Sequence, residues 1–388
     1  MTDEFNVKKD FYTLLGSKLI IRKNRFRSEV MNMKKTALIM AGGKGERFWP
    51  RSRVTLPKQF LSLTDDGKTM IQLTVERISP IVDMSDVYIA TNENYRELVK
   101  QQLPGIPEEN ILCEPVGRNT APCIGLGAVH VSKKYDDAVM IVLPSDHLIK
   151  NNEIFVETFN EACNMAEKGD NLVTVGITPN YPETGYGYIK YDNDGMCGNA
   201  RPVVQFVEKP NLQKAQEYLL QGTYLWNSGM FVWKVSTILK CFDKYMEKTA
   251  KGLEVIKEAI GQPNQDDVLN EVFPQLESLS VDYGIMEKAE NIYTIPGNFG
   301  WDDVGSWLAV GRIKENDKDG NVVNGNVIAI DTKNCVIEGQ EKLIAAVGLT
   351  DIVIVDTKDA TLVAAKESAG QIKQVLAKLR EDGRNEYL

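Results

Sequence analysis

The stretch ALIMAGGKGERFWP (Ala37–Pro50) joins an apolar run to a glycine-rich loop. The apolar run predicts a buried strand. The loop is not a mononucleotide P-loop, because Lys44 is followed by Gly45 and not by Ser or Thr. It is not a dinucleotide fingerprint, since Phe48 stands where a small residue is needed. Free backbone N–H groups beside the guanidinium of Arg47 still suit a phosphate, with an ordinary glycine turn as the alternative.

The composition is that of a globular protein large enough for two domains, with 388 residues, 43% of them hydrophobic and 26% charged. A net charge of -9 argues against a nucleic-acid partner. No apolar run is long enough to span a bilayer, so we expect no membrane partner. The six cysteines form no Cys-x-x-Cys pair, which disfavours a zinc site or a disulfide framework and favours a reducing, cytoplasmic compartment.

Residues 1–33 differ from the rest, being basic and carrying an apolar patch that Lys18 interrupts. A signal peptide needs a longer uninterrupted apolar core. We expect a disordered extension, or a start assigned upstream of a product that begins at Met31 or Met33, and give the segment no function.

From residue 34 onward, short β-rich runs alternate with helical stretches. TALIMAG, DVYIAT, AVMIVLPSD and NLVTVGI are the strand candidates, and helices are expected around NENYRELVKQQL and EIFVETFNEACNMAEKG. This alternation predicts an α/β fold with a doubly wound, mostly parallel sheet over residues 34–314. Ligands bind such sheets beyond the carboxyl ends of the strands. One helical block is expected over 237–260.

The C-terminal part changes character after WDDVGSW. Short strands separated by Asn, Asp and Gly turns predict a small β-helix-like domain over 315–388, with helices only at its end. The polar segment ENDKDGN marks the boundary. The strand-rich tail offers edges to a partner chain, and we expect a homodimer, although the sequence does not fix the assembly.

Several polar residues follow predicted strands or begin predicted helices. Lys58, held by Pro57, could supply a charge to phosphates, or be a solvated surface lysine. Asp146 ends the strand AVMIVLPSD and could hold Mg²⁺, completed by Asp302 or Asp303, although each aspartate alone is more often a turn or cap residue. Earlier in the chain, Arg118, Asn119 and Thr120 come just before another predicted helix. This segment suits a base edge or an anion, with ordinary capping as the alternative.

A second group of polar residues suggests sugar contacts. Tyr186 and Gly187 lie in a glycine turn, Glu208 and Lys209 end a strand, and Asn227 is expected in a turn between two apolar runs. The simpler alternatives are a turn for Tyr186 and Gly187, a surface ion pair for Glu208 and Lys209, and a hairpin for Asn227. No Gly-x-Ser-x-Gly elbow or other convincing nucleophile occurs in the sequence.

Eight ordered motifs resemble the sugar-nucleotide pyrophosphorylases, and among them the bacterial mannose-1-phosphate guanylyltransferase group. They are MAGGKGERFWP, PKQF, EPVGRNTAP, LPSDH, GYGYIKY, FVEKP, WNSGMFVW and GWDDVGSW. The resemblance runs from about residue 34 to the end. It implies a Rossmann-like, glycosyltransferase-A-like nucleotidyltransferase sheet followed by a left-handed β-helix-like domain.

The resemblance also implies a role for each candidate. Nucleotide contacts are implied for Ala41, Gly42, Gly43, Gly45, Arg47, Arg118, Asn119, Thr120, Ser145 and Asp146. Sugar-phosphate contacts are implied for Tyr186, Gly187, Glu208, Lys209 and Asn227, metal ligation for Asp146 and Asp303, and catalysis for Arg47, Lys58, Asp146, Lys209 and Asp303. Asp303 is preferred to Asp302 because the family's aspartate lies two residues after the tryptophan.

By this resemblance, GTP and mannose 1-phosphate give GDP-mannose and pyrophosphate with a divalent metal, most simply Mg²⁺. The attacking phosphate oxygen is already anionic, so no general base is required. Two alternatives remain open at this point. One is a sister enzyme that joins UTP or dTTP to glucose 1-phosphate, and the other is a non-catalytic regulatory relative, which should lack a metal aspartate or the loop arginine.

Overall fold

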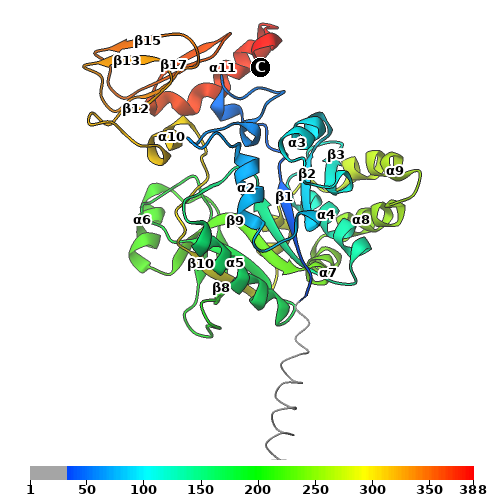
Figure 1. Cartoon of the computed structure of the whole chain (residues 1–388). Coiled ribbons are helices and arrows are strands. Elements are labelled where there is room, and N and C mark those ends of the chain that lie inside the picture. The colour runs from blue at the N-terminus through cyan, green and yellow to red at the C-terminus, as the bar shows by residue number, and fades with distance from the viewer. Residues whose placement is uncertain (1–32) are drawn as a thin grey trace, which may run out of the picture. The chain divides into compact units, whose positions relative to one another are not determined.

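The predicted alternation of strands and helices builds one mixed sheet in the computed structural model, which describes residues 33–388 (Figure 1). Apart from Met33, the extension expected at 1–33 lies outside the described residues. The strands of the sheet are β1 (Lys35–Met40), β2 (Val87–Asn92), β3 (Ile111–Glu114), β4 (Val139–Pro144), β6 (Leu172–Ile177), β7 (Tyr188–Tyr191), β8 (Arg201–Val207), β9 (Tyr224–Lys234) and β10 (Ile292–Gly297). Their order is β3-β2-β1-β4-β9-β6-β10-β8-β7.

Most strands of this sheet point in one direction, as predicted. β3, β2, β1 and β4 pair in parallel, and β6 pairs in parallel with β10. β9 and β8 run against their neighbours. The turn expected at Asn227 is wrong, because β9 runs unbroken through it. The strand is irregular there, where Gly229 adopts a φ of 68° that glycine tolerates best.

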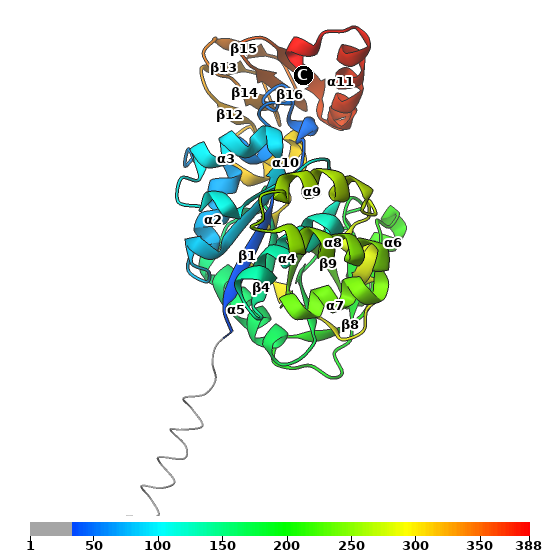
Figure 2. The same ribbon diagram turned by 90° about the vertical axis from the view of Figure 1, so that its right-hand side faces the viewer.

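Helices cover both faces of the sheet, so its central strands are buried on both sides (Figures 1 and 2). One face carries α4 (Thr120–Lys134), α7 (Val235–Tyr245), α8 (Glu247–Ala259) and α9 (Gln265–Val272), and the other carries α2 (Met70–Ile78) and α5 (Asn152–Glu167). The remaining helices, α3 (Arg96–Gln102) and α6 (Leu212–Gln221), lie beside β3 and β9. The single helical block predicted for 237–260 is two helices, because the backbone of Met246 leaves the helical region between them.

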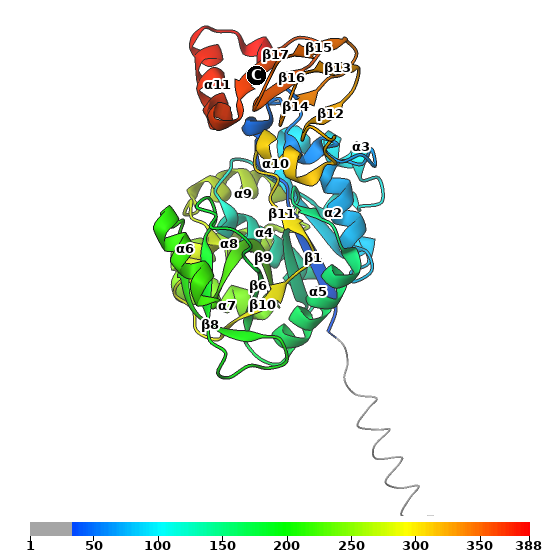
Figure 3. The same ribbon diagram turned by 90° about the vertical axis from the view of Figure 1, so that its left-hand side faces the viewer.

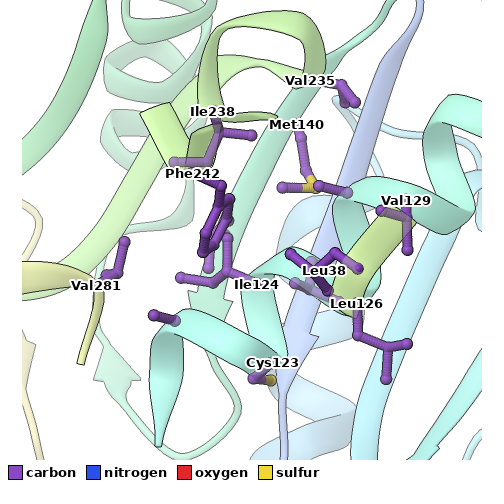
Figure 4. Packing of buried hydrophobic residues seen from close by; sticks show 14 of the residues in the cluster. Leu38, Cys123, Ile124, Leu126, Val129, Met140, Val235, Ile238, Phe242 and Val281 are labelled. Atoms are coloured by element: carbon purple, nitrogen blue, oxygen red, sulfur yellow. The ribbon is translucent and has the colours of Figure 1, made fainter. Parts of the chain in front are cut away.

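The core between the sheet and its first helical layer depends on close approach of α4 (Figure 4). Leu38 of β1 and Met140 of β4 pack against Ile124 of α4 and Phe242 of α7, all fully buried. A Cβ at Gly127 would lie 2.6 Å from a methyl of Leu38. The glycine therefore lets the helix approach the strand. No helix within residues 33–388 combines the length and the apolar content that a membrane span requires.

The C-terminal strands stack as the β-helix-like prediction expects (Figure 3). β12 (Val322–Asn324), β14 (Val336–Glu338) and β16 (Ile352–Asp356) pair in parallel, as do β13 (Val327–Ile330) and β15 (Ile344–Val347). β17 (Thr361–Ala365) closes the first set antiparallel, and α11 (Ile372–Glu381) follows it. The left hand of the coil stays a prediction.

A shared core joins the C-terminal strands to the glycine-rich segment. Trp307, in α10 (Trp307–Ile313), packs on Phe48 with ring centroids 5.1 Å apart and donates from its indole nitrogen to the carbonyl of Trp49. The same cluster holds Leu376 of α11. Residues Lys35–Leu388 thus form one compact unit, and the boundary expected near residue 315 stays a prediction.

We expect Trp307→Ala to lower the free energy of unfolding by about 3–5 kcal/mol, the usual loss for a fully buried aromatic. Urea unfolding measures this change. The control is Leu308→Ala on the same helix, where the side chain is only partly buried and the loss should be smaller. Equal losses in the two variants would show that the shared core does not depend on Trp307.

Candidate active site

Two cavities adjoin at the carboxyl ends of the central strands. The strand-end cavity has a volume of about 540 Å³, and its lining includes Gly42, Gly43, Arg118, Asn119, Thr120, Tyr186, Gly187, Glu208, Lys209, Asn227 and Asp303. The loop cavity has a volume of about 310 Å³, and its lining includes Gly45, Arg47, Lys58, Asp146 and Asp303. His147 and Asp303 line both, so the two cavities share a wall.

Two of the residues expected to contact the nucleotide line neither cavity. Ala41 is fully buried, and its carbonyl accepts hydrogen bonds from the side chains of Gln59 (2.8 Å) and Thr91 (3.0 Å). Ser145 is also buried, and its N–H donates to the carbonyl of Met40 at 3.1 Å. In the described structure, both residues form hydrogen bonds at the strand ends and line neither cavity.

The glycine-rich loop wraps closely around Lys58. Gly45 has a φ of 60°, and a Cβ there would lie 2.5 Å from both the backbone nitrogen and the Cβ of Lys58. Any other residue would have to displace the lysine. The loop then enters a short 3-10 helix, η1 (Glu46–Phe48), which holds Arg47 at the loop cavity.

Lys58 is buried rather than a solvated surface lysine, with its side chain 6% exposed. Its ammonium lies 3.0 Å from a carboxylate oxygen of Asp146 and donates to the backbone carbonyl of Asp303 at 2.7 Å. Burial would raise the pKa of Asp146, but the charge of Lys58 and its hydrogen bond to the carboxylate hold that pKa below its ordinary value. Asp146 is therefore ionised near neutral pH.

The two neighbouring aspartates have separate partners. Asp303 accepts a hydrogen bond from the hydroxyl of Tyr186 at 2.7 Å and faces the cavities. Asp302 forms a two-pronged ion pair with Arg312, at 3.0 and 3.2 Å. The short strand β11 (Trp301–Asp302) brings this segment to the end of β4 by pairing with β5 (Leu148–Ile149). This geometry favours Asp303 over Asp302 at the site.

Aromatic and amide groups shape the far part of the strand-end cavity. The ring of Tyr186 lies 5.4 Å from that of Trp226 and 5.2 Å from that of Trp301, and burial raises its hydroxyl pKa well above the ordinary range. The Asn227 side chain donates to a carboxylate oxygen of Asp282 at 2.7 Å, while its backbone N–H donates to the carbonyl of Gly187 at 2.8 Å. These contacts hold Asn227 and Gly187 in place at the strand-end cavity.

The segment before α4 caps the helix as well as lining the cavity. The Asn119 side chain accepts from the N–H of Thr120 at 2.9 Å, and the Thr120 hydroxyl accepts from the N–H of Val281, also at 2.9 Å. Arg118 donates to the carbonyl of Pro274. Asn119 thus caps α4, as the alternative interpretation expected, and Arg118, Asn119 and Thr120 also line the strand-end cavity.

The two carboxylates that line the loop cavity, Asp146 and Asp303, suit a hard divalent cation. Asp146 and Asp303 are joined through Lys58, and within the described residues no cluster of three or more His, Cys, Asp or Glu could hold a metal. A zinc site would need such a cluster. Magnesium commonly uses one or two carboxylates together with substrate phosphates, which fits this pair.

The model of the nucleotidyl transferase family matches residues 36–320. The chain belongs to the nucleotidyl transferase family. A second model, of the MannoseP isomerase/GMP-like beta-helix domain, matches residues 325–379.

Relatives of this nucleotidyl transferase carry one name repeatedly. The chain is 39% identical over 367 residues to a mannose-1-phosphate guanylyltransferase of Salmonella montevideo, covering 91% of this chain and 75% of that protein. It is 39% identical over 362 residues to one of Klebsiella pneumoniae, covering 90% and 75%. A solved structure from Thermus thermophilus, titled a mannose-1-phosphate geranyltransferase, matches with a TM-score of 0.81 and 35% identity, covering 90% of this chain and all of that one.

Two residues that the motifs did not single out line the cavities of the nucleotidyl transferase. Glu114 ends β3 inside the motif EPVGRNTAP, is 6% exposed, and has a buried carboxylate oxygen with no hydrogen-bond partner among residues 33–388. Burial raises its pKa to about 7. His147, next to Asp146, accepts from the indole of Trp301 at 3.1 Å, and burial lowers its pKa. The strand-end rule could have found Glu114, since it follows an apolar run.

The raised pKa of Glu114 predicts a pH-dependent stability. The folded state holds this proton between about pH 4.5 and about pH 7, where the unfolded state releases it. The stabilisation is therefore complete below about pH 4.5 and is lost as the pH rises through about 7, a change of about 3 kcal/mol. Urea unfolding of the wild type and Glu114→Gln at pH 5 and pH 8 measures the difference.

We expect Glu114→Gln to lose less stability than the wild type between those two pH values. The matched control is Glu109→Gln, which changes an exposed glutamate just before β3 and should follow the wild type. Parallel pH profiles for all three proteins would contradict the assignment.

Proposed function

We propose that this nucleotidyl transferase transfers GMP from GTP to α-D-mannose 1-phosphate, giving GDP-mannose and pyrophosphate. The observation that carries the proposal is the shared wall between two cavities. A polar and aromatic cavity suits a base and a sugar, while a cationic cavity with two carboxylates suits phosphates. The names of the relatives supply the choice of mannose and guanine.

The proposed reaction needs alignment more than proton transfer. An anionic phosphate oxygen of mannose 1-phosphate attacks the α-phosphorus of GTP in line, a new P–O bond forms, and the bond to the β-phosphate breaks. The electron pair leaves on pyrophosphate, so no general base is required. The pKa of His147, lowered by burial, keeps its ring neutral near pH 7, which fits a structural role beside the reacting phosphates.

The residues would divide this work by position. Arg47 and Lys58, at the loop cavity, neutralise the triphosphate, and the backbone of Gly42, Gly43 and Gly45 lets it approach. Lys209 would hold the sugar phosphate. Tyr186, Gly187, Glu208 and Asn227 would contact the sugar hydroxyls from the strand-end cavity.

A divalent cation, most simply Mg²⁺, would be held by Asp146 and Asp303. When bound, it would neutralise charge that develops on the phosphate oxygens. Lys58 fixes Asp146, and the hydroxyl of Tyr186 fixes the carboxylate of Asp303 at 2.7 Å.

Glu114 supports guanine over uracil or thymine as the base. An ionised carboxylate accepts hydrogen bonds, and the Watson–Crick edge of guanine offers adjacent N–H donors at N1 and N2. Uracil and thymine offer a single N–H there. Because bound guanine would favour the ionised form, GTP binding should pull the pKa of Glu114 down from about 7.

We also propose a cytoplasmic homodimer. Six free cysteines suit a reducing compartment. Exposed aliphatic side chains on β13 and β15, including Ile328, Ile330 and Val347, would suit contact with a second copy.

A substrate panel tests the function. GTP, UTP and dTTP are each combined with mannose 1-phosphate or glucose 1-phosphate, with and without chelator, and pyrophosphate release is measured. We expect GTP with mannose 1-phosphate to react fastest, chelator to stop the reaction, and Glu114→Gln to lose preference for GTP. A clear preference for UTP with glucose 1-phosphate would overturn the proposal, and no release from any pair would favour a regulatory relative.

Asp146→Asn and Asp303→Asn should each remove most turnover while the protein stays folded. Loss of one well-placed charged group commonly costs about 2.7–4 kcal/mol of transition-state stabilisation, or roughly 10²–10³ in rate. The matched control is Asp302→Asn, which removes a carboxylate engaged with Arg312 and should keep near-normal turnover. Near-normal pyrophosphate release by either of the first two variants would refute the metal assignment.

A further inference from the structure

The C-terminal helix α11 reaches the loop cavity. Lys373, in its first turn, lines that cavity together with Arg47, Lys58 and Asp146. It does not line the strand-end cavity. A residue more than 300 positions from the glycine-rich loop therefore borders the same space.

Three cations at the loop cavity form no ion pair of their own among the described residues, while two carboxylates that line it have other partners, Glu46 with Arg380 and Asp146 with Lys58. The side chains of Lys44, Arg47 and Lys373 form no hydrogen bond or ion pair within the part of the chain that the structure describes. Like charges gathered around one cavity repel one another unless an anion joins them. Three cations without ion pairs suit a polyphosphate better than a single carboxylate or sugar hydroxyl.

The position of α11 against the loop is fixed by contacts that follow Lys373 in the chain. Arg380 donates to Glu46 of η1 at 2.6 Å. Leu376 is buried in the core that also holds Phe48. Beyond the helix, the indole of Trp49 donates to the carbonyl of Tyr387 at 2.7 Å. Lys373 is thus carried by an anchored helix, although its own side chain is exposed.

We propose that Lys373 binds the β- and γ-phosphates of the nucleotide, and hence the leaving pyrophosphate, so that the C-terminal domain completes the phosphate site. The inference rests on the function proposed above. Lys373 lines only the loop cavity, whereas Asp303 and His147 also line the strand-end cavity, in which the sugar is proposed to bind. It would act on the leaving group rather than on mannose 1-phosphate.

Binding of inorganic pyrophosphate to the full chain tests this role without turnover. Isothermal titration calorimetry in magnesium buffer compares the wild type, Lys373→Ala, Lys373→Arg and the control Lys378→Ala. Lys378 lies on the same helix but pairs with Asp382 at 3.0 Å in solvent. We expect Lys373→Ala to weaken binding about tenfold, as loss of a charge-assisted contact does, and the other two to stay near the wild type.

Kinetics then separate this inference from the proposed function. Lys373→Ala should raise KM for GTP, and KM for pyrophosphate in the reverse direction, with KM for mannose 1-phosphate unchanged. Unchanged pyrophosphate binding by Lys373→Ala, with an unchanged melting temperature, would overturn the inference. A chain that binds pyrophosphate through Lys373 yet transfers no GMP would uphold the inferred site and reject the proposed function.

Discussion

The site depends on the buried ammonium of Lys58. It joins the carboxylate of Asp146 at the end of β4 to the backbone of Asp303, which lies 245 residues after the lysine in the chain. A buried charge is costly unless it is paired and hydrogen-bonded, so these partners are held in place by the lysine as much as they hold it. Gly45 is also needed for this arrangement, because only a residue without a Cβ leaves room for the lysine.

This arrangement makes the C-terminal domain part of the site's foundation. The loop that follows Gly45 turns into η1, whose Phe48 packs on Trp307. Trp307 in turn lies in one core with the strands of the β-helix-like coil and with α11. Asp146 follows β4 of the sheet and Asp303 follows β11, which pairs with β5, whereas the segment after Gly45 packs on the C-terminal core. Both supports are needed to set the width of the loop cavity.

Much of this site could be predicted from sequence, because parallel strands end at one edge of a sheet. Residues that follow apolar runs, such as Gly43 and Asp146, were predicted to meet there, and each lines a cavity. Asn227 was expected in a turn, but local apolar runs do not reveal that a bend at Gly229 lets one strand continue. The raised pKa of Glu114 comes from burial that distant segments create. Lys373 could not be assigned, since nothing in a short helix after a β-rich domain indicates which cavity it reaches.

The hydrogen bond between the Trp49 indole and the carbonyl of Tyr387 has a consequence for synthesis. The glycine-rich loop leaves the ribosome long before Tyr387, which helps to hold it. During translation the nascent sheet therefore carries a loop whose final geometry waits for more than 330 later residues. Until Tyr387 has been synthesised, the residues proposed to bind phosphate lack one of the contacts that hold their loop.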